Sequence, residues 1–345
     1  MKRILFFLFI ILLLGAAVAG WLIFGTSVHV PESKYLYIPT GSTYEMVKEN
    51  LISKKIINRT TAFDKVAKAL KYDHLIKPGR FRIKSGMSMI SLVRMLRSGD
   101  QAQVNFIINK VHTKEELAEK MGNNFEFSAD AALQFMIDSA SKFKLDSNNI
   151  MSLIIPDTYT FTWNNTPSKV FRKLYAAHER FWTAERKQKA ANMHLKNDQV
   201  YTLASIVEEE TTKNDDKGKI ASVYINRLRK GMRLAADPTV KFALRDFSLT
   251  RIYNKHLSAS SPYNTYMNAG LPPGPICTPS SKTIDAVLNA PETNYLFFVA
   301  KADFSGYSNF ASSFAQHNVY ANEYRKALDS LYLSKNKNPD NSDSK

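Results

Sequence analysis

The chain has 345 residues, of which 44% are hydrophobic and 23% charged, a globular composition that excludes a wholly disordered protein. Its length predicts about two domains. The single cysteine, Cys277, excludes an intramolecular disulfide, a zinc ribbon and a CxxC redox site. The formal net charge of +16 favours anionic partners.

The N-terminus contains an unbroken apolar run at residues 4–24, directly after Lys2 and Arg3. Such a run can cross a bilayer as a helix, and the positive charges before it would keep the N-terminus in the cytoplasm. We expect residues 1–25 to form a single-pass anchor in the inner (cytoplasmic) membrane, with the remaining chain on the periplasmic, or extracytoplasmic, side. The alternative is a cleaved signal peptide, because residues 17–19 resemble a cleavage site. In both cases an exported basic chain meets anionic lipids and cell-wall polymers, and we expect no nucleic-acid partner.

Short strands followed by amphipathic helices predict a small α+β module after the anchor. Residues 35–38 and the alternating segment around Phe81 have the pattern of strands, and residues 60–70 have that of a helix. Capping boxes at residues 42–45 and 113–116 predict the starts of two further helices.

The next part of the chain, residues 128–198, is predicted to be mainly helical. It is interrupted by an aromatic, β-branched segment around Pro156 that reads as a strand and a turn. Further on, residues 295–301 predict a buried strand. The polar tail at residues 336–345 is expected to be disordered.

One glutamate falls where an apolar residue would be expected. Leu203, Ile206 and Val207 define a helical stripe, and Glu210 falls on the same stripe one turn later. A carboxyl group that faces a core loses hydration, which raises its pKa and suits it to act as a general acid. The charge pattern alone also permits the alternative of a solvated helix end.

The neighbouring acidic and amide residues have less definite roles. Glu208 and Glu209 rotate off the apolar stripe, and we expect Glu209 to be exposed. Asn226, together with Arg227, interrupts the apolar face of the following helix. Asp237 begins a third helix, either as its cap or as a substrate contact.

A long loop rich in Pro, Gly, Asn and Tyr follows, and it is too aromatic for a simple linker. Its hydroxyls, amide and flat rings could hold an amide-bearing sugar. The residues concerned are Tyr263, Asn264, Thr265 and Tyr266. Near the end of the region, His317 and Asn318 are either structural or in contact with substrate.

Four separated motifs resemble the bacterial endolytic murein transglycosylase, or YceG-like, family. They are ASIVEEET, ASVYINRLRKGMRLAADPTV, SPYNTYMNAGLPPGPICTPS and the segment at residues 310–318. The resemblance implies an α+β chain with an N-terminal transmembrane helix, a LysM-like α+β module at residues 34–103 and a mainly helical α+β catalytic domain at residues 104–335. Within that domain, residues 104–198 would be a connecting helical part and residues 199–335 the catalytic core.

The resemblance further implies a lyase that cleaves the β-1,4 bond between N-acetylmuramic acid and N-acetylglucosamine inside nascent glycan strands, leaving a 1,6-anhydro end and terminating glycan elongation. Glu210 would be the catalytic residue, and Glu208 a substrate contact or a support. The residues expected to bind substrate are Asn226, Asp237, Tyr263, Asn264, Thr265, Tyr266, His317 and Asn318. No metal or organic cofactor is expected, and the partners would be peptidoglycan strands, with peptidoglycan synthases as further candidates.

Two alternatives are kept. A two-carboxylate muramidase would hydrolyse the same bond, with Asp237 or Glu208 as its second carboxylate. A non-catalytic scaffold would only bind peptidoglycan and recruit synthases.

Overall fold

The computed structural model describes residues 4, 6–14, 20, 28–58, 60–143 and 145–337. Most of the expected anchor at residues 1–25, and all of the cleavage-site pattern at residues 17–19, lie outside the described residues. Within the described ranges, no helix combines the length and apolarity needed to span a membrane. The helix at the C-terminal end extends to Lys337, so the predicted disorder is wrong for residues 336 and 337, and the rest of the tail lies outside the described residues.

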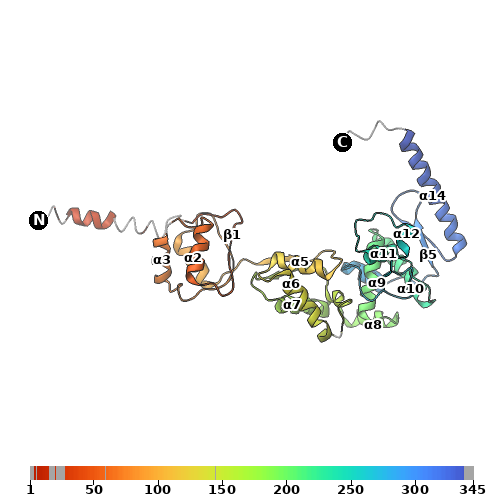
Figure 1. Cartoon of the computed structure of the whole chain (residues 1–345), viewed down its shortest axis with the longest axis horizontal. Coiled ribbons are helices and arrows are strands. Elements are labelled where there is room, and N and C mark those ends of the chain that lie inside the picture. The colour runs from red at the N-terminus through yellow and green to blue at the C-terminus, as the bar shows by residue number, and fades with distance from the viewer. Residues whose placement is uncertain are drawn as a thin grey trace. The chain divides into compact units, whose positions relative to one another are not determined.

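The chain forms two compact units, drawn in Figure 1. The first comprises Met1–Phe106, Lys120–Ala129 and Tyr159–Val170, and the second comprises Ile107–Glu119, Asp130–Thr158 and Phe171–Lys345. Both units are discontinuous in sequence.

The first unit begins with strands and helices that alternate along the chain. They are β1 (Tyr35–Ile38), α2 (Tyr44–Ser53), α3 (Thr60–Ala69), β2 (Gly79–Arg82) and α4 (Met89–Ser98). β1 and β2 pair antiparallel, and their alternation buries Leu36, Ile38 and Phe81 under the helices while the intervening side chains face outward. The predicted strands and the predicted helix at residues 60–70 are therefore confirmed.

The start of α2 differs by one residue from the prediction. Thr43 is the N-cap, and its side chain accepts a hydrogen bond from the backbone N–H of Met46 at 3.3 Å. Ser42, the expected cap, instead donates its hydroxyl to the carbonyl of Pro39 at 2.7 Å. Because the Ser42 hydroxyl is already bonded within the preceding turn, Thr43 caps the helix.

The middle of the chain contributes elements to both units. They are β3 (Val104–Ile107), α5 (Lys114–Asn124), α6 (Ala129–Ser139), the 3₁₀ turns η1 (Ala140–Phe143) and η2 (Ile150–Leu153), β4 (Thr158–Phe161) and α7 (Pro167–Phe181). β3 and β4 form a two-stranded sheet. The predicted strand around Pro156 is thus confined to Thr158–Phe161. Thr113 accepts from the backbone N–H of Glu116 at 3.1 Å, as its capping box predicts, but the Glu116 carboxylate reaches the N–H of His112 rather than that of Thr113.

The second unit is built around one buried helix. Its later elements are α8 (Ala184–Asn192), α9 (Asn197–Glu210), α10 (Asn214–Arg229), α11 (Asp237–Leu244), α12 (Asn254–Leu257), α13 (Ser281–Leu288), β5 (Phe297–Ala300), β6 (Ser308–Ala311) and α14 (Phe314–Lys337). α9 packs against α8, α10, α11 and α13, and every residue from Val200 to Val207 is buried. A helix that is covered on all sides in this way has a fixed orientation, and so its last turn is held firmly.

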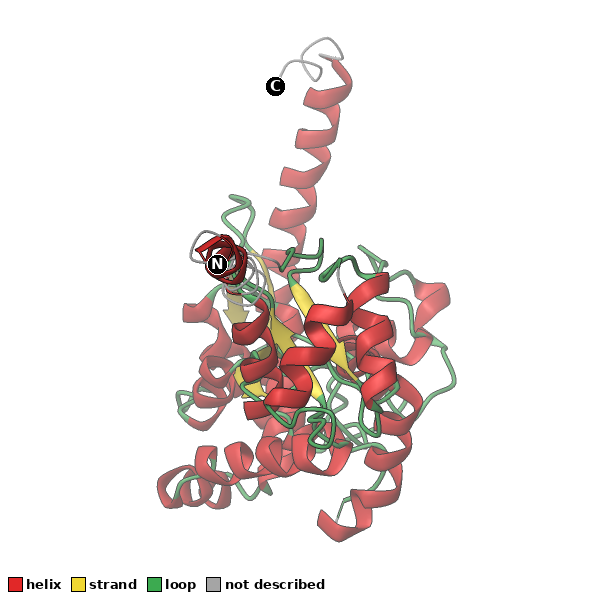
Figure 2. Ribbon diagram, turned by 90° about the vertical axis from the view of Figure 1, so that its left-hand side faces the viewer, coloured by secondary structure: helices red, strands yellow, loops and turns green. Residues whose placement is uncertain are grey.

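The hairpin of β5 and β6 and the helix α14 complete this unit. The expected strand within residues 295–301 is present as β5, which pairs with β6, but it is half-buried instead of buried, so that prediction is wrong in its burial. Figures 1 and 2 show α14 leaving the hairpin and extending beyond it towards the C-terminus. The described chain is therefore a helix-rich α+β protein with three two-stranded sheets.

Candidate active site

The last turn of α9 carries three consecutive glutamates, residues 208–210, into three different environments. Successive helical residues are rotated by about 100°, so the three carboxylates point to different sides of the helix end. Each meets a different set of partners, and the pKa of each changes accordingly.

Glu210 has an unusually basic carboxyl group. Its Oε1 accepts a hydrogen bond of 2.6 Å from the hydroxyl of Tyr224 on α10. Burial, together with the charge of Asp237, raises the pKa of Glu210 to about 7, against the opposing effects of the Tyr224 hydrogen bond and of Arg227 and Lys241. The raised pKa agrees with the position of Glu210 on the apolar stripe. Near neutral pH this carboxyl can both donate and accept a proton.

Glu208 is held as a carboxylate by groups from α10 and α13. Its Oε2 accepts from the Lys217 ammonium at 3.0 Å, from the Ser280 hydroxyl at 3.1 Å, and from the Thr283 hydroxyl. Burial would raise the pKa of Glu208, but these three partners outweigh it and lower the pKa. Glu208 therefore stays ionised and ties the helix end to its neighbours.

Glu209 is not exposed, so that prediction is wrong. Its carboxylate pairs with the Lys110 ammonium at 2.9 Å and with Nε2 of His112 at 3.4 Å, and its side chain is only 20% exposed. Although burial opposes the change, His112 and Lys110 lower the pKa of Glu209 to about 2. The helical phase of α9 could not reveal these partners, because they lie in a distant segment that hydrogen bonds between Val111 and Thr278 fix beside the helix end.

Asp237 and Tyr266 form a hydrogen-bonded pair beside Glu210. The Tyr266 hydroxyl donates to the Asp237 carboxylate at 2.6 Å. Burial, this hydrogen bond and the charges of Asp237 and Glu210 raise the pKa of Tyr266, and the charge of Asp237 in turn raises the pKa of Glu210. Asp237 is the first residue of α11 and Pro238 the second, while Ala236 occupies the cap position without a side-chain bond. The capping interpretation of Asp237 is therefore wrong, and its carboxylate is directed to the site.

Two residues of the site, Tyr224 and Arg227, were not predicted from the sequence. They are three positions apart and so share one face of α10. The Arg227 guanidinium donates to the carbonyls of Leu296, at 2.7 Å, and Leu234. A tyrosine and an arginine spaced in this way, beside the apolar residues at 220, 221, 223 and 225, are the signal that could have identified them.

Asn264 and Thr265 serve the loop itself. The Asn264 amide, which is fully buried, donates to the carbonyls of Leu257 at 2.8 Å and Ala259 at 2.9 Å. Thr265 is 1% exposed and its hydroxyl accepts from the N–H of Ala236 at 3.0 Å. The prediction of direct substrate contact is wrong for these two residues, because their polar atoms are used inside the protein.

Asn226 and Tyr263 are partly engaged in internal contacts. The Asn226 amide nitrogen donates to the carbonyls of Thr293 at 2.7 Å and Tyr295 at 3.0 Å, so it fixes the approach to β5. The half-buried Tyr263 ring packs on Phe242, with 4.5 Å between ring centroids.

His317 and Asn318 lie in the first turns of α14 and are both half-buried. The His317 ring stacks on Phe297 at a centroid distance of 5.3 Å. Burial and the charge of Arg227 lower the pKa of His317, so it is neutral at pH 7. A neutral imidazole near Arg227 can donate or accept a hydrogen bond.

A polar cleft of about 320 Å³ lies beside Glu208. Its lining includes Asn109, Lys110, Asp157 and Ser280, which supply amide, ammonium, carboxylate and hydroxyl groups. Hydroxyl-rich ligands such as sugars are bound by groups of this kind. The cleft therefore extends the polar surface around the end of α9.

Residues 36–323 match the YceG-like family, and the chain therefore belongs to this family. It is 27% identical over 334 residues to the endolytic murein transglycosylase of Bacillus subtilis (strain 168), an alignment that covers 89% of this chain and 91% of that protein. It is 25% identical over 305 residues to the endolytic murein transglycosylase of Streptococcus pneumoniae serotype 2 (strain D39), which covers 76% of this chain and 53% of that protein. The chain thus spans about half the length of this second relative.

A crystal structure of a YceG-like protein from Listeria monocytogenes has a similar fold, with a TM-score of 0.55 and 26% sequence identity. The likeness covers 83% of this chain and 99% of that one.

Proposed function

We propose that this protein is an endolytic lytic transglycosylase, a lyase that cuts peptidoglycan glycan strands between N-acetylmuramic acid and N-acetylglucosamine. The observation that carries the proposal is the buried Glu210 carboxyl, with its pKa near 7 and its hydrogen bond from Tyr224, in a YceG-like chain. Curated relatives over most of the chain bear the name endolytic murein transglycosylase.

Glu210 would act twice in one turnover. As an acid it gives its proton to the glycosidic oxygen, so that the bond to C1 of the muramoyl residue breaks and the N-acetylglucosamine hydroxyl leaves. As a carboxylate it then takes the proton of the muramoyl 6-hydroxyl while that oxygen bonds to C1. The product is a 1,6-anhydro end, no water is consumed, and Glu210 ends protonated as it began. A pKa near the working pH suits both roles.

The three neighbouring glutamates differ in their ability to perform this chemistry. Lys217 holds Glu208 ionised, and Lys110 and His112 hold Glu209 ionised, so neither carries a proton at neutral pH. Glu210 alone among the three is partly protonated there. The assignment of the acid therefore follows from the partners of each carboxylate, and it makes Glu208 a support for the end of α9.

The test is a comparison of Glu210→Gln and wild type on purified glycan strands, with products identified by mass spectrometry. Wild-type protein should produce 1,6-anhydro ends, and Glu210→Gln should lose several powers of ten in rate because glutamine has no transferable proton. Glu119→Gln, an exposed change on α5, is the matched control and should retain activity. Formation of anhydro ends by Glu210→Gln at the wild-type rate would contradict the proposal.

A muramidase is the second candidate, because the Asp237 carboxylate lies near enough to Glu210 to raise its pKa. A hydrolase would use this second carboxylate to activate water or to form a covalent intermediate. Its products would have reducing ends in place of anhydro ends, so the same mass spectra separate the two reactions. A non-catalytic scaffold would be favoured if cells with Glu210→Gln kept wild-type glycan lengths.

We also propose that residues 1–25 anchor the chain in the cytoplasmic membrane, with the N-terminus inside, and that residues 34–103 are a LysM-like module that orients glycan. The apolar run after Lys2 and Arg3 supports the anchor. A site beside the membrane would act on nascent strands and so terminate their elongation near the synthases. A reporter fused to the C-terminus should give an extracytoplasmic signal, and a cytoplasmic signal would contradict this topology.

A further inference from the structure

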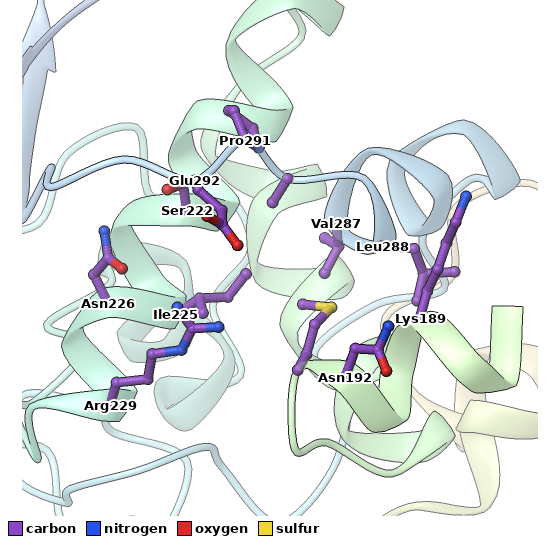
Figure 3. A pocket seen from close by; sticks show the side chains of 12 residues that line it. Lys189, Asn192, Ser222, Ile225, Asn226, Arg229, Val287, Leu288, Pro291 and Glu292 are labelled. Carbon is purple, nitrogen blue, oxygen red and sulfur yellow. The ribbon is translucent and has the colours of Figure 1, made fainter.

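A second cavity lies between α8, α10 and α13, apart from the Glu210 site. It has a volume of about 170 Å³ and is open to solvent, and its apolar wall includes Met193, Ile225, Val287 and Leu288. Figure 3 shows Arg229, Glu292 and Asn192 around this wall, on different sides of the cavity. The lining thus combines an apolar surface with groups of both charges.

Among the six polar residues of the lining, Lys189, Ser222 and Asn226 already form hydrogen bonds within the protein. Lys189 pairs with Glu185 and donates to Asn289, at 2.7 Å in each case, and Figure 3 shows it pointing away from the cavity. Ser222 hydrogen bonds to Thr293 at 2.7 Å. These groups therefore add little to ligand recognition.

Three polar groups are left for a ligand. In the part of the chain that the structure describes, neither the Arg229 guanidinium nor the Glu292 carboxylate forms an ion pair or a hydrogen bond. The Asn192 side-chain oxygen accepts from Gln188 at 3.0 Å, which leaves its two N–H donors. A guanidinium binds a carboxylate, and a carboxylate binds an ammonium group. The matching ligand has one group of each kind and an apolar part between them.

We propose that this cavity binds a zwitterionic peptide, with its carboxylate on Arg229, its ammonium group on Glu292 and its apolar side chains against Met193 and Leu288. The inference rests on the proposed function for the source of such a peptide, since the stem peptides of peptidoglycan carry free carboxylates and a free amino group. The cavity would then distinguish glycan with peptides from bare glycan.

The cavity and Glu210 lie on opposite faces of α10. At about 100° per residue, Tyr224 and Arg227 face one side, whereas Ser222, Ile225 and Arg229 face the other. A helix with its side chains is about 10–12 Å across. An extended peptide of four residues spans about 13–14 Å. The path around half of the helix is about 16–19 Å, which exceeds this length, so the bound peptide would belong to a sugar beyond the one at Glu210 or to another strand.

The test is calorimetric titration of the full chain with a tetrapeptide of the sequence Ala-γ-Glu-Lys-Ala, acetylated at its N-terminus and with peptidoglycan stereochemistry. Two analogues remove one charge type each, by amidation of the carboxylates or by acetylation of the lysine. Each analogue should bind about tenfold more weakly, as expected for loss of one charged hydrogen bond. Binding of peptide requires no turnover, so failure here is distinguishable from failure of the transglycosylase proposal.

The variants assign each charge to its residue. Arg229→Gln should weaken binding of the parent peptide and abolish the effect of amidation, whereas Glu292→Gln should abolish the effect of lysine acetylation. Lys230→Gln and Glu323→Gln are exposed control changes outside the lining and should bind as wild type does. No saturable binding at millimolar peptide, or variants that keep both preferences, would overturn the proposal. A shift of the Met193 methyl resonance on peptide addition gives a readout that depends on no variant, and its absence would also overturn it.

Kinetics identify the source of the peptide. If the KM of Arg229→Gln rises on peptide-bearing glycan but not on peptide-free glycan, the cavity binds a peptide of the strand being cut. If the KM is the same on both substrates while peptide binding is lost, the bound peptide belongs to another strand.

Discussion

Replacement of Glu210 by glutamine should stabilise the protein at alkaline pH while it abolishes activity. The pKa of Glu210 is about 7 in the folded chain, compared with an ordinary value of 4.5. A carboxyl with a raised pKa binds more protons in the folded state than in the unfolded state, so stability falls as pH rises from about 4.5 to 7. Glutamine does not ionise, and its amide oxygen can still accept the hydrogen bond from Tyr224, so the variant should escape this loss.

The size of the effect follows from the difference between the two pKa values. At about 1.4 kcal/mol per pKa unit, ionisation of Glu210 above pH 7 costs the folded state about 3 kcal/mol. Part of the Glu210 side chain is open to water, which reduces this cost to about 2 kcal/mol. For a unit of this size, that corresponds to a rise in Tm of about 4–8 °C at pH 8. At pH 4 both proteins are uncharged at this position, and the difference should vanish.

Differential scanning calorimetry of wild type and Glu210→Gln at pH 8 and pH 4 measures this difference and resolves the transitions of the two units. Glu208→Gln is the matched control, because the pKa of Glu208 is lowered by its partners and its loss should destabilise the fold at pH 8. An unchanged or lower Tm for Glu210→Gln at pH 8 would refute the reasoning that its carboxyl is desolvated.

Three further changes have distinct expected results. Glu209→Gln should lower the free energy of unfolding at pH 7 by about 2 kcal/mol in urea titrations, and the deficit should disappear as pH falls from 4.5 towards 2; a constant deficit would contradict the ion pairs. Tyr224→Phe removes a hydrogen bond that favours the carboxylate, so it should raise the pKa of Glu210 by about one unit and move the pH profile of kcat/KM to higher pH. A move of the profile to lower pH would contradict this hydrogen bond. Asn264→Ala should cost about 2 kcal/mol in thermal unfolding because it leaves two buried carbonyls unpaired, and a rise in KM at unchanged stability would restore its predicted role in binding.

The local sequence pattern predicted much of the secondary structure, and it also identified Glu210 as a carboxyl group with a raised pKa. The strands at residues 35–38 and around Phe81 follow from alternation, because one face of that sheet is buried. The raised pKa of Glu210 follows from helical phase, because α9 is buried along nearly its whole length. In both cases the pattern within the element itself shows which of its side chains are buried.

The errors occurred where distant residues decide the environment. Glu209 is off the apolar stripe of its own helix, yet it is paired with Lys110. Lys110 lies about 100 residues earlier in the sequence, and the pattern of the helix does not show that it is a neighbour. Asn264 has a polar side chain suited to a sugar, but its loop needs that amide to pair two internal carbonyls. Composition identifies such a residue as polar, and only the path of the backbone shows which acceptor it meets.

Tyr224 and Arg227, the neighbours of Glu210 on α10, are held in place by residues at β5, which is synthesised late. Arg227 is tied to Leu296, and the Tyr224 ring packs edge-on against Phe298, at a centroid distance of 5.9 Å. These supports are synthesised long after α9, and contacts of such large sequence separation form late. Until they arrive, Tyr224 and Arg227 lack these two supports. A growing chain therefore completes the surroundings of Glu210 only after β5 has been made.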